Sequence, residues 1–127
     1  MNTASNDFIT RRNMVWLNKI TDSHEFGGLV VIAVPSNTYG HESKDAEELK
    51  KWFFDEWESR FNVFQKTDVN THPMYQWLAK QSRKPANEDF VKYVVERDGV
   101  TVTKYGSRDG LVQHRNIEQH LKRCLKG

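Results

Sequence analysis

A continuous run of apolar residues from Leu29 to Val34 constrains the fold of this chain more than any other segment. The run is rich in β-branched valine and isoleucine, and it lacks the alternation of a strand with one solvated face. Strands with this pattern are buried on both faces, as in parallel sheets that helices cover on both sides. The run therefore predicts the central strand of an α/β fold.

Helical patterns flank this predicted strand. Between Phe8 and Ser23 the apolar residues recur at mixed helical spacings without an interrupting proline, which predicts a helix. Asp45 and Glu48 have the spacing of a capping box, so we expect a second helix from Asp45 to about Phe61. The apolar strand would thus have one helix before it and one after it.

The later segments switch between strand and helix. The run 63–69 is typical of a strand, and Asn70 or Thr71 is expected to cap a short helix. Pro73 would lie near the first turn of this helix, which extends to Ala79. This second unit of strand and helix favours a layered sheet with a right-handed crossover.

A hairpin and a helix close the chain. An Asp-Gly pair at 98–99, between β-rich runs at 90–96 and 100–105, is the strongest short-range sign of a hairpin. The tail from Leu111 to Leu125 has its apolar residues on one side, as in an amphipathic helix. The full order predicts a mixed α/β sheet that is flanked by helices and contains one antiparallel pair.

Composition and charge exclude several classes of protein. With 127 residues, 37% of them hydrophobic, the chain is expected to form one globular domain over residues 1–127. The net charge of +2 is too small to indicate nucleic acid or an anionic membrane as a partner. The single cysteine, Cys124, excludes an intramolecular disulfide, and no apolar run has the length of a membrane span. We therefore expect a cytoplasmic protein without a membrane contact.

Four ordered motifs carry a resemblance to a known family. The apolar strand ends in Pro-Ser-Asn-Thr-Tyr-Gly at 35–40, and Phe-Asn-Val-Phe-Gln-Lys-Thr-Asp-Val-Asn follows at 61–70. His-Pro-Met-Tyr-Gln-Trp-Leu occupies 72–78, and Asp-Phe-Val-Lys-Tyr occupies 89–93. These segments resemble the glutathione peroxidase motifs F-P-C-N-Q-F-G, F-P-V-F-x-K-x-D-V-N, H-P-L-Y-x-x-L and W-N-F-x-K-F-L. The resemblance implies a thioredoxin-like fold.

The register of this resemblance decides the expected chemistry. Counted back from Pro35 without a gap, Asn-Thr-Ala-Ser-Asn-Asp at 2–7 falls on the family's N-V-A-S-x-C. Asp7 then takes the place of the cysteine or selenocysteine that reduces peroxide in the family. That reduction needs a polarisable sulfur or selenium that attacks the O–O bond, and a carboxylate has no such redox states.

The residues that support catalysis in the family also differ here. In the same register the family's glutamine falls on His41 or Glu42, and its Trp-Asn pair falls on Glu88 and Asp89. The cysteine of the second motif, which resolves the oxidised intermediate in some relatives, lies near Ser36. The resemblance therefore predicts a pseudoenzyme in which no catalytic residue is retained.

The resemblance also implies that a strand is missing. Relatives carry a hairpin and a buried core strand before the N-V-A-S motif, whereas Met1 falls at the end of that strand. The loss would leave unpaired edges on the strand at 29–34 and on the hairpin, which is costly in a buried sheet. Three solutions remain open. The sheet closes up, a second copy or another protein donates a strand, or the chain starts inside a longer natural protein.

Two interpretations of the former peroxidatic pocket compete. The residues that would converge there are Asp7, Glu88, Asp89 and either His41 or Glu42. Oxygen-rich clusters of this kind hold Mg²⁺, Mn²⁺ or Ca²⁺. The alternative is a solvated acidic surface that needs no metal, and it leads us to expect neither a metal nor a cofactor.

The closing helix is basic around the only cysteine. Lys122 and Arg123 lie beside Cys124, and nearby positive charge lowers the pKa of a thiol. Its place at the end of the last helix favours a passive cysteine instead. The five histidines show no paired spacing of the zinc type. The basic helix offers a contact for nucleic acid, although a solvated polar face explains its charge equally well.

Aromatic residues supply the remaining candidates for an interface. The helix that starts at Asp45 carries more of them than one buried stripe can hide, so Trp52 or Phe54 is expected to face outward. We therefore predict a non-catalytic module that binds a protein partner or a second copy. The alternative is an enzyme, either a residual peroxidase or oxidoreductase with an unaligned thiol, or one that uses a metal at the acidic cluster.

Overall fold

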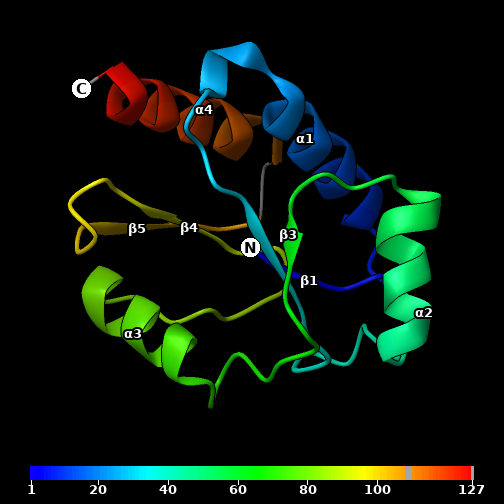
Figure 1. The fold of residues 1–127 in the computed structure, drawn as a ribbon. Coiled ribbons are helices and arrows are strands. Elements are labelled where there is room, and N and C mark those ends of the chain that lie inside the picture. Colours follow the sequence, from blue (N-terminus) through cyan, green and yellow to red (C-terminus); the bar gives the residue numbers. More distant parts are fainter. Residues whose placement is uncertain (108–109, 127) are drawn as a thin grey trace.

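Helices lie on both faces of the strands in this protein (Figure 1). The structure, a computed structural model, describes residues 1–107 and 110–126. Helices α1 (Thr10–Asp22) and α4 (Gly110–Lys126) pack against each other on one face, and α3 (Pro73–Ser82) lies on the opposite face. This layered arrangement is the α/β architecture that the sequence predicts.

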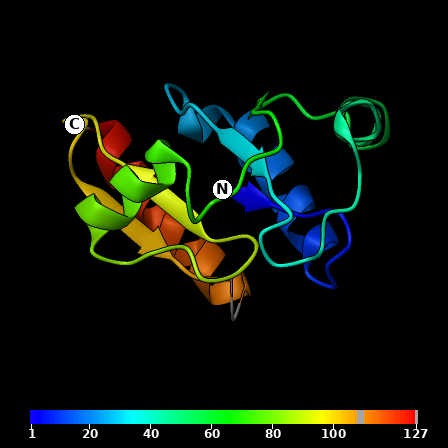
Figure 2. The ribbon, with the colours of Figure 1, turned by 90° about the horizontal axis from the view of Figure 1, so that it is seen from below.

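Two small sheets lie between these layers. Strands β1 (Asn2–Thr3), β2 (Ile32–Pro35) and β3 (Asn62–Val63) form a parallel sheet in the order β1-β2-β3. Strands β4 (Lys92–Val95) and β5 (Val102–Tyr105) form a separate antiparallel pair. Figure 2 shows the two groups of strands from below. Because the described strands form two separate sheets, the first of the three open solutions, a single sheet that closes up, is not the arrangement observed.

The predicted hairpin is confirmed. Gly99, in the turn between β4 and β5, has a φ of 75°, a conformation that favours glycine. The Asp98 carboxylate accepts hydrogen bonds from the Val100 and Thr101 amides, at 2.9 and 2.8 Å. The turn is therefore fixed by its own residues, which explains why local sequence is enough to predict it.

The central strand is shorter than the apolar run predicts. Strand β2 begins at Ile32, and Val30 is 72% exposed, so burial on both faces is wrong for the first half of the run. The reason is its pairing. The α-amino group of Met1 donates to the Ile32 carbonyl at 2.9 Å, and β1 offers β2 no partner before that point.

The strand predicted at 63–69 is reduced to β3. Beyond it the Thr67 amide still donates to the Pro35 carbonyl at 2.9 Å, so the segment continues alongside β2. The Thr67 hydroxyl, however, donates to the Gln65 carbonyl at 2.8 Å. A local bond of this kind competes with the regular ladder and ends the strand.

The capping box predicted at Asp45 is present, and α2 (Ala46–Lys51) follows it. The helix then widens into a π-helical turn, Trp52–Glu56, which ends where the Trp57 amide donates five residues back along the chain. Such turns break the α-helical pattern, so the helix ends before Phe61.

Helix α3 begins at Pro73 as expected, but its cap is His72. The caps predicted from sequence, Asn70 and Thr71, are wrong because both residues lie in the preceding turn. The Asp68 carboxylate accepts the Asn70 amide there at 2.8 Å, which places the helix start two residues later.

Two apolar clusters fill the space between the layers. The first cluster lies among α1, α2 and α4, and its members include Met14, Trp16, Leu17, Ile20, Phe53, Ile117 and Leu121. The second joins β2, α3 and the hairpin, and its members include Val34, Val69, Tyr75, Leu78, Val91 and Val102. The buried face of α4 confirms the amphipathic closing helix, although the side chain of Leu111 lies outside the described residues.

Asn2 is fully buried and ties the two sheets together. On one side it pairs with Val34 in the β1-β2 ladder. On the other, its carbonyl accepts the Phe90 amide at 2.9 Å, and its side chain accepts the Val91 amide at 3.0 Å. The same side chain donates to the Glu88 carbonyl at 2.9 Å. One residue thus sets how β4 sits beside β2.

Replacing Asn2 by alanine is expected to destabilise the protein by about 3 kcal/mol, because the buried Val91 amide and Glu88 carbonyl would lose their partner. Urea unfolding of wild type and N2A measures the loss. N6A is the matched control, since the Asn6 side chain is exposed, and it should leave the transition unchanged. Equal stabilities for N2A and wild type would contradict the linking role of Asn2.

Candidate functional site

The structure brings together three residues that the register assigns to the former peroxidatic pocket. His41 Nδ1 lies 2.6 Å from Asp89 Oδ2 and 3.3 Å from Asp7 Oδ2. Asp7 is held in the turn before α1, where its other carboxylate oxygen accepts the Ile9 amide at 3.2 Å. Asp7 also donates its own amide to the Thr10 hydroxyl at 3.1 Å. The predicted convergence of Asp7, His41 and Asp89 is therefore present.

Burial and charge shape the acid–base behaviour of this cluster. The hydrogen bond to Asp89 raises the pKa of His41, while burial raises the pKa of the Asp89 carboxyl. Asp89 is 3% exposed, and its Oδ1 is buried without a hydrogen-bond partner among the described residues. Both pKa shifts favour a proton shared between the His41 imidazole and the Asp89 carboxylate. The cluster therefore holds protons at a half-buried site, and none of its groups is a redox centre.

Glu42 and Glu88 do not join this cluster. Glu42 is fully buried, and its carboxylate accepts the Ser5 hydroxyl and the amides of Ser5 and Lys44. The Glu88 carboxylate accepts the Ser107 amide at 3.2 Å. The four carboxylates considered as a candidate metal site therefore do not converge, because Glu42 and Glu88 accept hydrogen bonds elsewhere. A wholly solvated acidic surface is wrong as well, since Glu42 and Asp89 are buried.

The pH dependence of stability tests the His41 contact. Because the folded pKa of His41 lies above 6.5, the stabilisation is full below pH 6.5 and is lost as the pH rises through the folded value. H41Q should therefore lose under about 1 kcal/mol below pH 6.5, a small effect because the ring is half exposed. At a pH about two units higher, urea unfolding should give nearly equal stabilities for H41Q and wild type. A difference that grows with pH would contradict this assignment.

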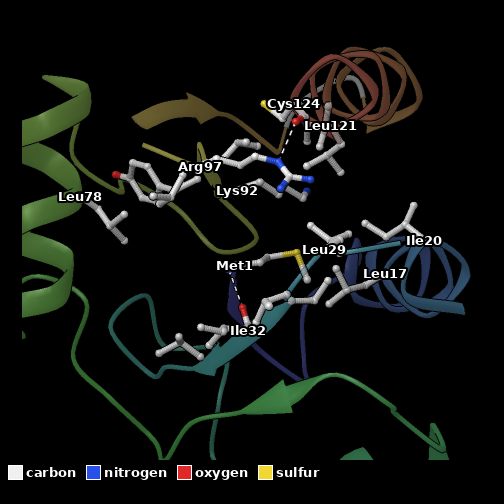
Figure 3. A pocket seen from close by; sticks show the side chains of 18 of the residues that line it. Met1, Leu17, Ile20, Leu29, Ile32, Leu78, Lys92, Arg97, Leu121 and Cys124 are labelled. Atoms are coloured by element: carbon white, nitrogen blue, oxygen red, sulfur yellow. Dashed lines mark hydrogen bonds between the residues drawn. The ribbon is translucent and has the colours of Figure 1, made fainter. Parts of the chain in front are cut away.

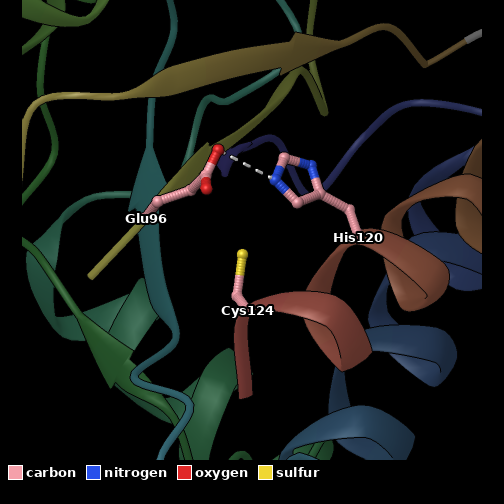
Figure 4. A group of neighbouring side chains, drawn as sticks. All are labelled: Glu96, His120 and Cys124. Atoms are coloured by element: carbon pink, nitrogen blue, oxygen red, sulfur yellow. Dashed lines mark hydrogen bonds and ion pairs between the residues drawn. The ribbon is translucent and has the colours of Figure 1, made fainter. Parts of the chain in front are cut away.

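The only cysteine lies at the opposite end of β4 from Asp89. Cys124 meets Glu96 and His120 there, and each of the three residues offers a donor atom within 4.8 Å of the others (Figure 4). Sequence reasoning missed this cluster, although His120 and Cys124 have the four-residue spacing that puts two side chains on one helix face. Burial and the Glu96 carboxylate raise the pKa of the Cys124 thiol, as a cysteine that is not activated would show.

A groove of about 530 Å³ separates β2 from β4 (Figure 3). Helices on both faces of the sheets also line it, with side chains that include Leu17, Ile20, Met74, Leu78, Ile117 and Leu121. Met1 and Lys92 line it, and Arg97 approaches Gly28 at another part of its wall. None of its lining residues is acidic. The groove thus lies between the two sheets, and residues of both β2 and β4 line it.

One further expectation about the surface, the one for Trp52, needs correction. Trp52 is 7% exposed and packs edge-on against Phe53, so it is not an interface residue. Phe54 is 47% exposed, as expected for an outward aromatic residue. On the basic helix, His114 stacks on Trp16 with ring centroids 4.0 Å apart, and burial lowers its pKa to about 4. His114 is therefore a neutral core residue, which its sequence neighbours do not reveal.

Comparison with known proteins gives the family. The model of the family described as "Glutathione peroxidase" matches residues 1–79. The chain is 29% identical to a probable phospholipid hydroperoxide glutathione peroxidase of Mesembryanthemum crystallinum, over 98% of the chain and 76% of that protein. It is 31% identical to the chloroplastic phospholipid hydroperoxide glutathione peroxidase of Pisum sativum, over 98% of the chain and 55% of that protein.

A third relative, glutathione peroxidase 1 of Caenorhabditis elegans, is 25% identical over 98% of the chain and 80% of its own length. The chain belongs to the glutathione peroxidase family. Its fold is accordingly thioredoxin-like, as the sequence motifs imply. In the described part of the chain, no helix has both the length and the apolar character needed to cross a bilayer.

Proposed function

We propose that this family member does not reduce peroxide and instead binds an extended peptide in the groove between β2 and β4. The observation that carries the proposal is the groove itself, an apolar space between two strand edges. A pocket that is mostly apolar with a few fixed polar groups is the usual form of a binding site. We also propose a reducing compartment such as the cytoplasm, in keeping with a single cysteine.

The proposed loss of peroxide reduction rests on which residues lie at the two ends of β4. At one end, the register puts Asp7 in the place of the peroxidatic residue, and Asp7 meets a histidine and a second carboxylate. The only thiol, that of Cys124, meets Glu96 at the other end. Six residues lie between Asp89 and Glu96, and they include the whole of β4, so the two groups lie at opposite ends of that strand. Within residues 1–107 and 110–126, therefore, no thiol faces the former peroxidatic pocket.

Backbone pairing favours a peptide as the ligand. The Ile32 carbonyl accepts from Met1, so the Ile32 amide, on the same side of β2, points along the groove. Just after β4 the Glu96 amide donates to the Thr101 carbonyl across the hairpin, which leaves Tyr93 and Val95 with their backbone groups turned away from β5. Both edges therefore offer donors and acceptors that only another backbone satisfies in register.

Charge favours one direction for this peptide. The α-amino group of Met1 is buried, and burial followed by the nearby Lys92 lowers its pKa to about 5. Burial also lowers the pKa of Lys92 to about 7. A free carboxylate at the end of the peptide would favour the protonated form of both amines and so be attracted to this end of the groove. It would accept from the Ile32 amide and the Met1 amino group together, with the peptide parallel to β2.

A synthetic peptide tests the proposal directly. We expect an acetylated hexapeptide of alternating valine and threonine with a free C-terminal carboxylate to bind about tenfold more tightly than its amidated form, the effect of one charge-assisted hydrogen bond. Calorimetry measures both affinities. Preference for dodecanoate over the peptide would overturn the proposal in favour of a lipid site. A dimer whose own contact blocks the peptide would overturn it in favour of self-association.

Two matched variants locate the binding. Val95 lines the groove and is 46% exposed, whereas Val112 is on the outer side of α4 and is 56% exposed. V95D places a carboxylate beside the peptide and should weaken binding by at least about tenfold through an unpaired charge near the interface. V112D carries the same charge change and should bind like wild type. Equal losses in both variants would show that the groove is not the site.

A peroxide-consumption assay tests the loss of catalysis. With thioredoxin or glutathione as reductant, wild type should consume hydrogen peroxide no faster than a blank without protein, because the thiol is remote from Asp7. C124S should behave identically. Sustained turnover in wild type that is lost in C124S would instead support the alternative function, a residual peroxidase with an unaligned thiol. This outcome is independent of peptide binding, so the two halves of the proposal fail separately.

A further inference from the structure

The cluster of Glu96, His120 and Cys124 joins the end of β4 to the last turns of α4 (Figure 4). His120 and Cys124 are four residues apart on one helix, so they project in the same direction. Glu96 directly follows β4 and points toward both, with its Oε2 3.3 Å from His120 Nε2. Three different donor atoms, oxygen, nitrogen and sulfur, thus face one small volume.

We propose that Glu96, His120 and Cys124 bind a zinc ion. The distances fit such an ion. With Zn–N and Zn–O bonds of about 2.1 Å, two ligands of a tetrahedral site lie about 3.4 Å apart. Glu96 Oε2 and His120 Nε2 are separated by 3.3 Å, long for a charged hydrogen bond and close to this ligand spacing. The Cys124 sulfur lies within 4.8 Å of both and needs only a small inward movement.

The surroundings hold the histidine in the required orientation. The Tyr105 hydroxyl lies 2.7 Å from His120 Nδ1. When Nδ1 carries the proton and donates it to that oxygen, the lone pair of Nε2 is directed toward Glu96 and Cys124. Ligating histidines in metal sites typically have such an outer partner, which fixes their tautomer. His120 itself is 6% exposed, so its ring has little freedom to turn away.

Charge balance selects a zinc-like ion. A thiolate, a carboxylate and a neutral imidazole together neutralise one divalent cation, which suits a partly buried position. Sulfur and imidazole nitrogen are softer ligands than Mg²⁺ or Ca²⁺ prefer, and the mixed set is typical of zinc. A cysteine binds zinc as the thiolate, so forming the S–Zn bond displaces the thiol proton to solvent. The fourth position of the tetrahedron remains for water.

Cobalt and zinc titrations of the full chain test this site. Cobalt should give the sulfur-to-metal charge-transfer band of a thiolate ligand, and zinc should abolish it. C124S should lack the band, and C124S and E96Q should lower the affinity for zinc by about a hundredfold or more, exceeding the loss of an outer partner. Y105F, which removes such an outer partner, should cost about tenfold. H24Q, at an exposed histidine, should bind like wild type.

Two outcomes would overturn the site. Wild type that shows no charge-transfer band and no zinc binding by calorimetry would exclude it. Zinc binding that survives in C124S but disappears in D7N would move the ion to the cluster of Asp7, His41 and Asp89, where no sulfur is available. Because Cys124 and Glu96 are only partly buried, their conservative variants should fold, and thermal unfolding without metal checks that they do.

Discussion

The hydrogen bonds of Asn2 are the constraint on which the rest of this structure depends. They are the direct backbone and side-chain link between the sheet of β2 and the hairpin of β4. By fixing Val91 beside β1 they also fix Asp89, two residues earlier, beside Asp7. Met1, the residue before Asn2, lines the groove, so this link lies at one end of it. The site and the groove are thus two consequences of one buried amide.

The sequence predicts well those features that are fixed by neighbouring residues. The Asp98-Gly99 turn and the capping box at Asp45 need no distant partner, and both are present as predicted. The length of β2 depends on where β1 pairs with it, and the cap of α3 depends on which residues Asp68 binds. The pairing with β1 is a tertiary effect that leaves no periodic trace in the sequence. The cap of α3 is decided by a local turn instead, because the Asp68 carboxylate accepts the Asn70 amide before the helix begins.

Of the two candidate sites, the sequence predicts one and misses the other. A family register placed Asp7, His41 and Asp89 together although they are far apart in the chain, and the structure agrees. The register could not separate His41 from its neighbour Glu42, whose side chain turns to Ser5. The four-residue spacing of His120 and Cys124 is visible in the sequence, but Glu96, the third residue of their cluster, comes from another element. Only the packing of α4 on the hairpin brings it close.

The position of the Met1 amino group has a practical consequence for handling this protein. Any residues fused to that end must leave from the point where the groove meets β1, and the nearest extended path runs along the open edges of β2 and β4. An affinity tag placed there would act as a tethered competitor, present at millimolar effective concentration.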